Sequence, residues 1–125
     1  MLGREIPREE WTRFLDTFSK QHEGWIANLE VVGRELGDQE ESTRLPLVGI
    51  SADKGPQPRI EVIVGRGPEA HLTHTINGVK RVWLKPPEEP ADEAIQVESE
   101  DGTITLVTFQ HAAPTQAERQ LPGRA

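Results

Sequence analysis

The order of two periodicities constrains this chain more than any other feature, because one helical pattern comes first and only strand patterns follow. Within residues 7–20 the apolar side chains fall on a single helix face at i, i+3, i+4 and i+7, namely Trp11, Phe14, Leu15 and Phe18. After Gly24, short runs rich in Val, Ile, Leu and Thr alternate with turn residues. Parallel strands need a crossover between them, and no helical pattern separates these runs. The sequence therefore predicts an α+β fold, with an N-terminal helix packed on an antiparallel sheet.

The strand-like runs predict a curved sheet of six to seven strands, arranged as a meander or a partial barrel. The runs cover residues 24–32, 44–51, 59–65, 71–76, 79–84, 94–100 and 103–111, with loops expected at 35–43, 52–58 and 86–92. The helix face is expected to pack on a core that includes Ile60, Val62, Val64, Val97 and Leu106. We expect a single domain over residues 1–111 and a flexible tail over residues 112–125.

Two dipeptides, Asn77-Gly78 and Asp101-Gly102, predict tight hairpins. Both favour the type I′ turn, whose twist matches that of the strands it joins. The first turn would place His74 opposite Arg81 and Leu72 opposite Trp83. The second would place Val97 opposite Leu106 and would gather four residues on one buried face, Ile95, Val97, Ile104 and Leu106.

Composition narrows the classes of function. The 125 residues contain no cysteine, which excludes disulfides, thiolate metal sites and cysteine nucleophiles. The net charge is −7, so the basic footprint of a nucleic-acid-binding protein is missing. No apolar run approaches the roughly 20 residues that cross a bilayer, and charges occupy the place of a signal peptide's apolar core. We therefore expect a cytoplasmic protein without a nucleic-acid or membrane partner, and no cofactor motif is present.

The segment His71-Leu-Thr-His74, with Glu69 just before it, offers a possible metal site, because imidazoles and a carboxylate are common ligands of Zn and related ions. Residues three apart on a strand point to opposite faces, so one ion could be held only if the backbone departs from strand geometry at residues 69–71. The alternative is a structural His74 on the core side, hydrogen-bonded or, opposite Arg81, responsive to pH.

Several segments of the chain resemble a family of small bacterial proteins that is known only as a domain of unknown function. They read REIPREEWTRFLDTFSKQHEGW, LPLVGISAD, GRGPEAHLTHTI, RVWL and ESEDGTITLVTF, and they run from about Arg4 to Phe109. The resemblance implies a one-domain protein and transfers no activity. It draws attention to five positions, His22, Glu23, Trp25, His71 and His74.

No complete catalytic set is present, so whether the protein is an enzyme stays open. The leading hypothesis is a non-enzymatic binding or protein-interaction module, with a homodimer as one form. Its basis is a sheet that is apolar on both faces, because Ile63 opposes Ile60 and Val62, and other strands repeat the pattern. The alternative is a histidine-based metal-binding protein, with hydrolysis as an extension, that would use His22, Glu69, His71 and His74.

Overall fold

The computed structural model confirms the α+β class and the curved antiparallel sheet. It describes residues 3–33, 37–53, 55–66, 71–86 and 93–111, with the backbone alone for residues 37–43. The expected tail at 112–125 and most of the loop expected at 86–92 lie outside the described residues. The elements in chain order are β1 (Arg4–Ile6), η1 (Arg8–Glu10), α1 (Trp11–His22), β2 (Ile26–Gly33), β3 (Gly37–Asp53), β4 (Arg59–Gly65), β5 (His71–Ile76), β6 (Val79–Lys85), β7 (Glu93–Ser99) and β8 (Ile104–Gln110).

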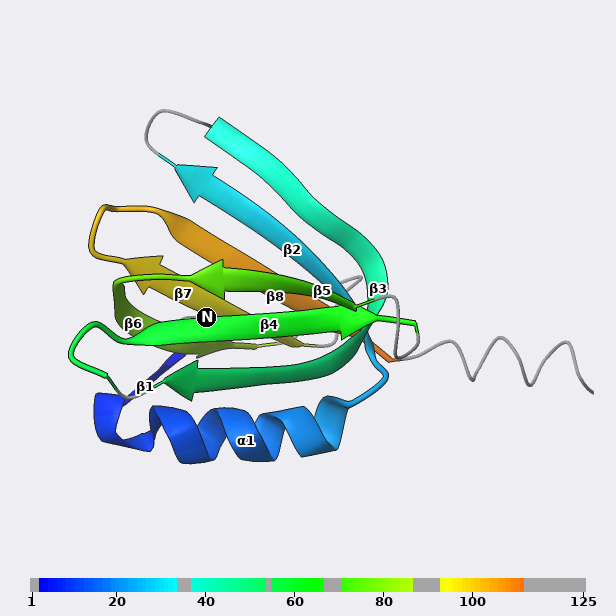
Figure 1. The fold of residues 1–125 in the computed structure, drawn as a ribbon, viewed down its shortest axis with the longest axis horizontal. Helices are drawn as coiled ribbons and strands as arrows, with labels where there is room; N and C mark the ends of the chain where they lie inside the picture. Colours follow the sequence, from blue (N-terminus) through cyan, green and yellow to red (C-terminus); the bar gives the residue numbers. More distant parts are fainter. Residues whose placement is uncertain (1–2, 34–36, 54, 67–70, 87–92, 112–125) are drawn as a thin grey trace, which may run out of the picture.

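These strands form a single open antiparallel sheet in the order β1-β6-β7-β8-β2-β3-β4-β5. Two meanders, β2 to β5 and β6 to β8, are joined because β8 pairs with β2. The sheet bends strongly, so that β4 and β5 lie in front of β6, β7 and β8 (Figure 1). The sheet has eight strands rather than six or seven, since the short β1 pairs with β6 at one edge.

The long strand β3 makes this bend. Its first half pairs with β2, its second half pairs with β4, and the register shifts between Leu47 and Gly49. The loop expected at 35–43 was wrong in part, because the backbone of residues 37–43 belongs to β3. That acidic segment lacks strand propensity, but pairing with β2 supplies its backbone hydrogen bonds, and such context outweighs propensity in sheets.

The helix α1 lies along the second half of β3, on the side away from β4 (Figure 1). Ser19 there satisfies the backbone N–H and C=O of Ile50, which a neighbouring strand would otherwise pair. The Ile50 N–H donates to Ser19 Oγ at 2.8 Å, and the Ser19 hydroxyl donates to the Ile50 carbonyl at 2.7 Å. At the other end of the helix, Trp11 Nε1 donates to the Ile6 carbonyl of β1 at 2.8 Å. The helix therefore connects the two layers of the bent sheet.

The predicted helix face is confirmed as the part of α1 that enters the core. Trp11, Leu15 and Phe18 are buried, and Phe14 packs against them half-buried. The helix ends as expected before Gly24, whose φ of 87° suits glycine. Both layers contribute to one apolar cluster that includes Ile60, Val62, Val64, Val97, Val107 and Phe109. None of the described helices is long and apolar enough to cross a membrane.

The second predicted hairpin exists, but its register was wrong by one residue. Glu98 pairs with Ile104, and Val97 pairs with Thr105 rather than Leu106. A type I′ turn needs positive φ at both central residues, and here Gly102 has it (91°) while Asp101 does not. The Ser99 N–H instead bonds the Thr103 carbonyl, giving a longer loop. A slip of one residue exchanges the faces, so Thr105 is buried and Leu106 faces outward.

The first predicted hairpin, at Asn77-Gly78, was wrong. Strand β5 pairs with β4, and β6 pairs with β1 and β7, so His74 does not face Arg81. The dipeptide instead connects β5 in one layer to β6 in the other. The chain is held at this crossing by a hydrogen bond from the Val79 N–H to the Pro58 carbonyl. A register shift between Val79 and Arg81 then turns Val82 inward in place of Trp83.

The Asp101 carboxylate stabilises the loop between β7 and β8. The Thr103 backbone N–H, followed by the Thr103 hydroxyl, holds the pKa of Asp101 below the ordinary aspartate value of about 3.9. Because the folded pKa is depressed, this contribution is present above the ordinary value and is lost as pH falls through the lower folded value. We expect Asp101→Ala to lower the melting temperature at pH 7. The difference from wild type should shrink as the pH falls below about 4 in thermal melts followed by circular dichroism. A difference that is constant across this range would contradict the assignment.

Candidate functional site

His22 lies at the end of α1 inside an aromatic cluster. Its ring stacks on Phe18 with centroids 3.8 Å apart, and it meets the Trp25 ring edge-on at 4.4 Å. Strand register explains why Glu93 reaches it. Glu93 is paired with Phe109 across β7 and β8, so both side chains point to the side of the sheet that α1 covers.

Both nitrogens of His22 are engaged. Nδ1 lies 2.9 Å from the Phe18 carbonyl, which can only accept, so Nδ1 donates. Nε2 lies 2.5 Å from Glu93 Oε1, a contact that requires one proton between the two atoms. Neither nitrogen is left for a substrate or a metal ion. The imidazole is buried, its side chain 8% exposed, and it ties α1 to the first residue of β7.

Glu23 and Trp25, which follow His22 in the sequence, lie where the helix ends and the sheet begins. Glu23 is exposed just after the last helical residue, and Trp25 forms a backbone pair with Leu47 of β3. The Trp25 ring lies 4.5 Å from the His111 ring. The HEGW segment is therefore the junction at which the helix stops and the chain enters the sheet.

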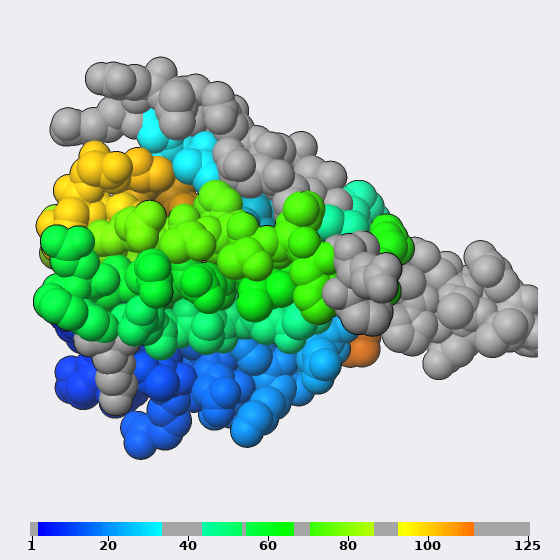
Figure 2. Space-filling model, viewed as in Figure 1, coloured from blue at the N-terminus to red at the C-terminus, as the bar shows by residue number. Residues whose placement is uncertain are grey.

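The two histidines of β5 point to opposite faces, as their spacing predicts. His74 is paired with Val62 and His71 with Gly65 of β4, and β5 runs along the surface of the molecule (Figure 2), where His71 to Thr73 and Thr75 are exposed. His71 is exposed. His74 lies on the core side of β5, as predicted, because its partner Val62 is buried, but it is only half-buried and Trp83 is not its neighbour. The outer strand β5 has one neighbour, which leaves Leu72 53% exposed.

The predicted metal ligands are not gathered in the part of the chain that the structure describes. Within it, no group of three or more His, Asp or Glu side chains could hold an ion. Glu69 lies outside the described residues. His22 contacts Glu93 and the aromatic cluster, whereas His71 and His74 lie on the outer strand β5.

Arg81 also differs from its predicted setting. Its guanidinium lies 3.3 Å from Glu98 and 3.9 Å from Glu5, both on strands beside β6. This exposed network lies on the outer face of the sheet, away from His74, so the proposed pairing of His74 with Arg81 is removed.

The outer face of β6, β7, β8 and β2 carries an apolar surface, here called the outer patch and defined as Val32, Trp83, Ile104 and Leu106. Cross-strand partners share a face, and two rows place these side chains together, Trp83–Gln96–Leu106 and Glu98–Ile104–Val32. Val32 is 40% exposed, and the other three are partly exposed. A second apolar face is thus present, but on β8 it holds Ile104 and Leu106, which were predicted to face the core, whereas Val107 and Phe109 are buried.

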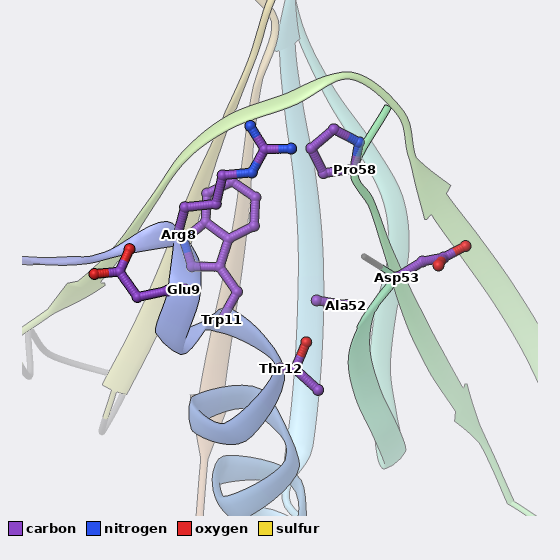
Figure 3. Close-up of a pocket in the computed structure, with 7 residues that line it drawn as sticks. All are labelled: Arg8, Glu9, Trp11, Thr12, Ala52, Asp53 and Pro58. Carbon is purple, nitrogen blue, oxygen red and sulfur yellow. The ribbon is translucent and has the colours of Figure 1, made fainter. Parts of the chain in front are cut away.

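A cleft of about 370 Å³ opens between the start of the helix and the turn from β3 to β4 (Figure 3). Its walls are formed by Arg8, Glu9, Trp11, Thr12, Ala52, Asp53 and Pro58. The Arg8 guanidinium lies over the Trp11 ring, 5.8 Å from its centroid. The volume of the cleft falls within the range of small-ligand sites.

Comparison with known proteins supplies the family. Residues 2–118 match a family of unknown function, DUF5335. The chain belongs to this family. An uncharacterized protein of Aquifex aeolicus (strain VF5) is 32% identical over 114 residues, which cover 91% of this chain and 97% of the relative. No solved structure gives a significant match. The resemblance to a bacterial domain of unknown function is confirmed.

Sequence reasoning missed two features of this DUF5335 protein. Glu93 stands 71 positions from His22, in a proline-rich acidic stretch that resembles a solvated loop. Arg8 belongs to a first helical turn rich in charge, where charge usually reflects exposure to solvent. Glu93 reaches His22 only through the register of β7, and Arg8 lines a cleft only because the end of β3 approaches the start of the helix.

Proposed function

We propose that this DUF5335 protein is a non-catalytic interaction module that associates with a second copy of itself through the outer patch. The observation that carries the proposal is the row Trp83–Gln96–Leu106, in which a tryptophan and a leucine flank an amide on an outward face. Tryptophan is enriched among the residues that dominate binding energy at protein interfaces.

The charges around the outer patch favour a copy of the same chain as the partner. Arg81 lies within ion-pair distance of Glu98 and Glu5 of its own chain. Apolar side chains around Gln96, with this charged network on one side and Glu30 beside Leu106 on the other, have the composition of a protein–protein interface, in which a polar rim surrounds apolar residues.

Gln96 supports the same choice. In a two-fold dimer each residue near the axis meets its own counterpart. An amide carries both a donor and an acceptor, so a pair of glutamines can hydrogen-bond to each other, whereas two carboxylates or two ammonium groups would repel.

Sedimentation velocity at micromolar concentrations tests this association. Wild-type protein, with a chain mass of 14.0 kDa, should sediment as a dimer. Leu106→Lys should weaken association by about tenfold or more, because it places a charge in a desolvated contact. Each copy has a net charge of −7, so added salt should strengthen the dimer by screening this repulsion.

The matched control is Leu72→Lys. It introduces the same charge at a more exposed leucine, on β5, and should leave the sedimentation of the dimer unchanged. Circular dichroism of both variants verifies that they fold. A wild-type monomer at all concentrations, or a dimer lost with Leu72→Lys but kept with Leu106→Lys, would contradict the proposal.

A further inference from the structure

We infer that the cleft beside Arg8 is a binding site for a small aromatic carboxylate. This inference goes beyond the interaction module and uses no residue of the outer patch. It begins from the charges that line the cleft. Among the described residues, no carboxylate lies within ion-pair distance of Arg8, which contacts the Trp11 ring instead.

The acidic residues of the cleft do not offset Arg8. The Asp53 carboxylate pairs with Arg59 at 2.8 Å, and in Figure 3 it points away from the cleft. The Glu9 carboxylate also points away, whereas the Arg8 guanidinium extends toward Pro58 (Figure 3). Among the described residues that line the cleft, Arg8 is therefore the one cationic group, which favours an anion as ligand.

The shape of the cation and the neighbouring surface indicate the rest of the ligand. A guanidinium matches a carboxylate through two parallel hydrogen bonds, and Thr12 adds a hydroxyl that lines the same cleft. Trp11, Ala52 and Pro58 line the same cleft and supply its apolar atoms. A few polar groups on an apolar wall are typical of small-molecule sites, and here they fit a flat ring that bears one carboxylate.

Titration of isotope-labelled protein with benzoate tests this site. The indole N–H of Trp11, a residue that lines the cleft, donates to the Ile6 carbonyl and should shift in a saturable manner in proton–nitrogen NMR spectra. Three probes serve as controls. Acetate keeps the carboxylate without the ring, benzyl alcohol keeps the ring without a charge, and benzylamine keeps the ring with a positive charge. Each should bind at least about tenfold more weakly than benzoate.

Arg8→Gln should raise the dissociation constant for benzoate by at least about tenfold, because it removes the charged partner. Arg13→Gln is the control, since Arg13 is an exposed arginine of the adjoining helix α1 and does not line the cleft. Both variants should keep the wild-type melting temperature. The inference is overturned if benzoate does not shift the Trp11 signal, if benzylamine binds equally well, or if Arg8→Gln binds benzoate as tightly as wild type does. The Leu106→Lys variant should bind benzoate like wild type, which separates this test from that of self-association.

Discussion

Phe109→Ala is expected to lower the free energy of unfolding by about 3–5 kcal/mol, the range for deleting a large buried aromatic side chain. Phe109 is fully buried on β8 and lies edge-on to Phe18 of α1, with ring centroids 5.0 Å apart. It is also paired with Ala27 of β2, so it lies where the helix meets the junction of the two meanders. Urea denaturation followed by circular dichroism measures the loss. Since domains of this kind have a total stability of about 5–15 kcal/mol, the variant should be near the limit of folding.

Leu72→Ala is the matched control for this substitution. Leu72 is also a large apolar residue of the sheet, but it is 53% exposed, so its truncation should change stability by less than about 0.5 kcal/mol. Equal losses for the two variants would contradict the placement of the core between α1 and β8.

His22→Ala should cost about 2–3 kcal/mol, because it removes the hydrogen bonds to Glu93 and to the Phe18 carbonyl together with the stacked ring. Glu93 is 34% exposed, so water reaches the carboxylate that is left, and the loss is smaller than for a fully buried pair. A double-mutant cycle with Glu93→Ala in urea denaturation should give a coupling of about 1–2 kcal/mol.

A second substitution separates the hydrogen bonds of His22 from its packing. His22→Phe keeps a stacked ring on Phe18 but removes both ring nitrogens, and should retain part of the stability that His22→Ala loses. A coupling free energy of zero between His22 and Glu93 would contradict the inference that this contact holds α1 to β7.

The helix and the strands could be predicted because both depend on local periodicity. The spacing of Trp11, Leu15 and Phe18 fixes a helix face without knowledge of what covers it. Each of the seven predicted runs corresponds to a strand, β2 to β8. The family resemblance singled out His22 and Trp25 as candidate binding residues. In the structure both residues lie at the junction between helix and sheet.

Pairing and register could not be predicted in the same way. The dipeptides Asn77-Gly78 and Asp101-Gly102 read alike, yet one changes layers and the other closes a hairpin with a longer loop. The difference depends on the Pro58 carbonyl that binds Val79, a contact between segments remote in sequence. A shift of one residue then decided which of Thr105 and Leu106 enters the core.

The claim that the outer patch joins two copies is tested most directly by isotope-filtered NMR on an equal mixture of labelled and unlabelled protein. If the outer patch is the interface, magnetisation should transfer from the methyl groups of Ile104 and Leu106 in one copy to the Trp83 ring of the second copy. Contacts between copies that involve Leu72 of β5 but none of these residues, or a spectrum without any contact between copies, would contradict it.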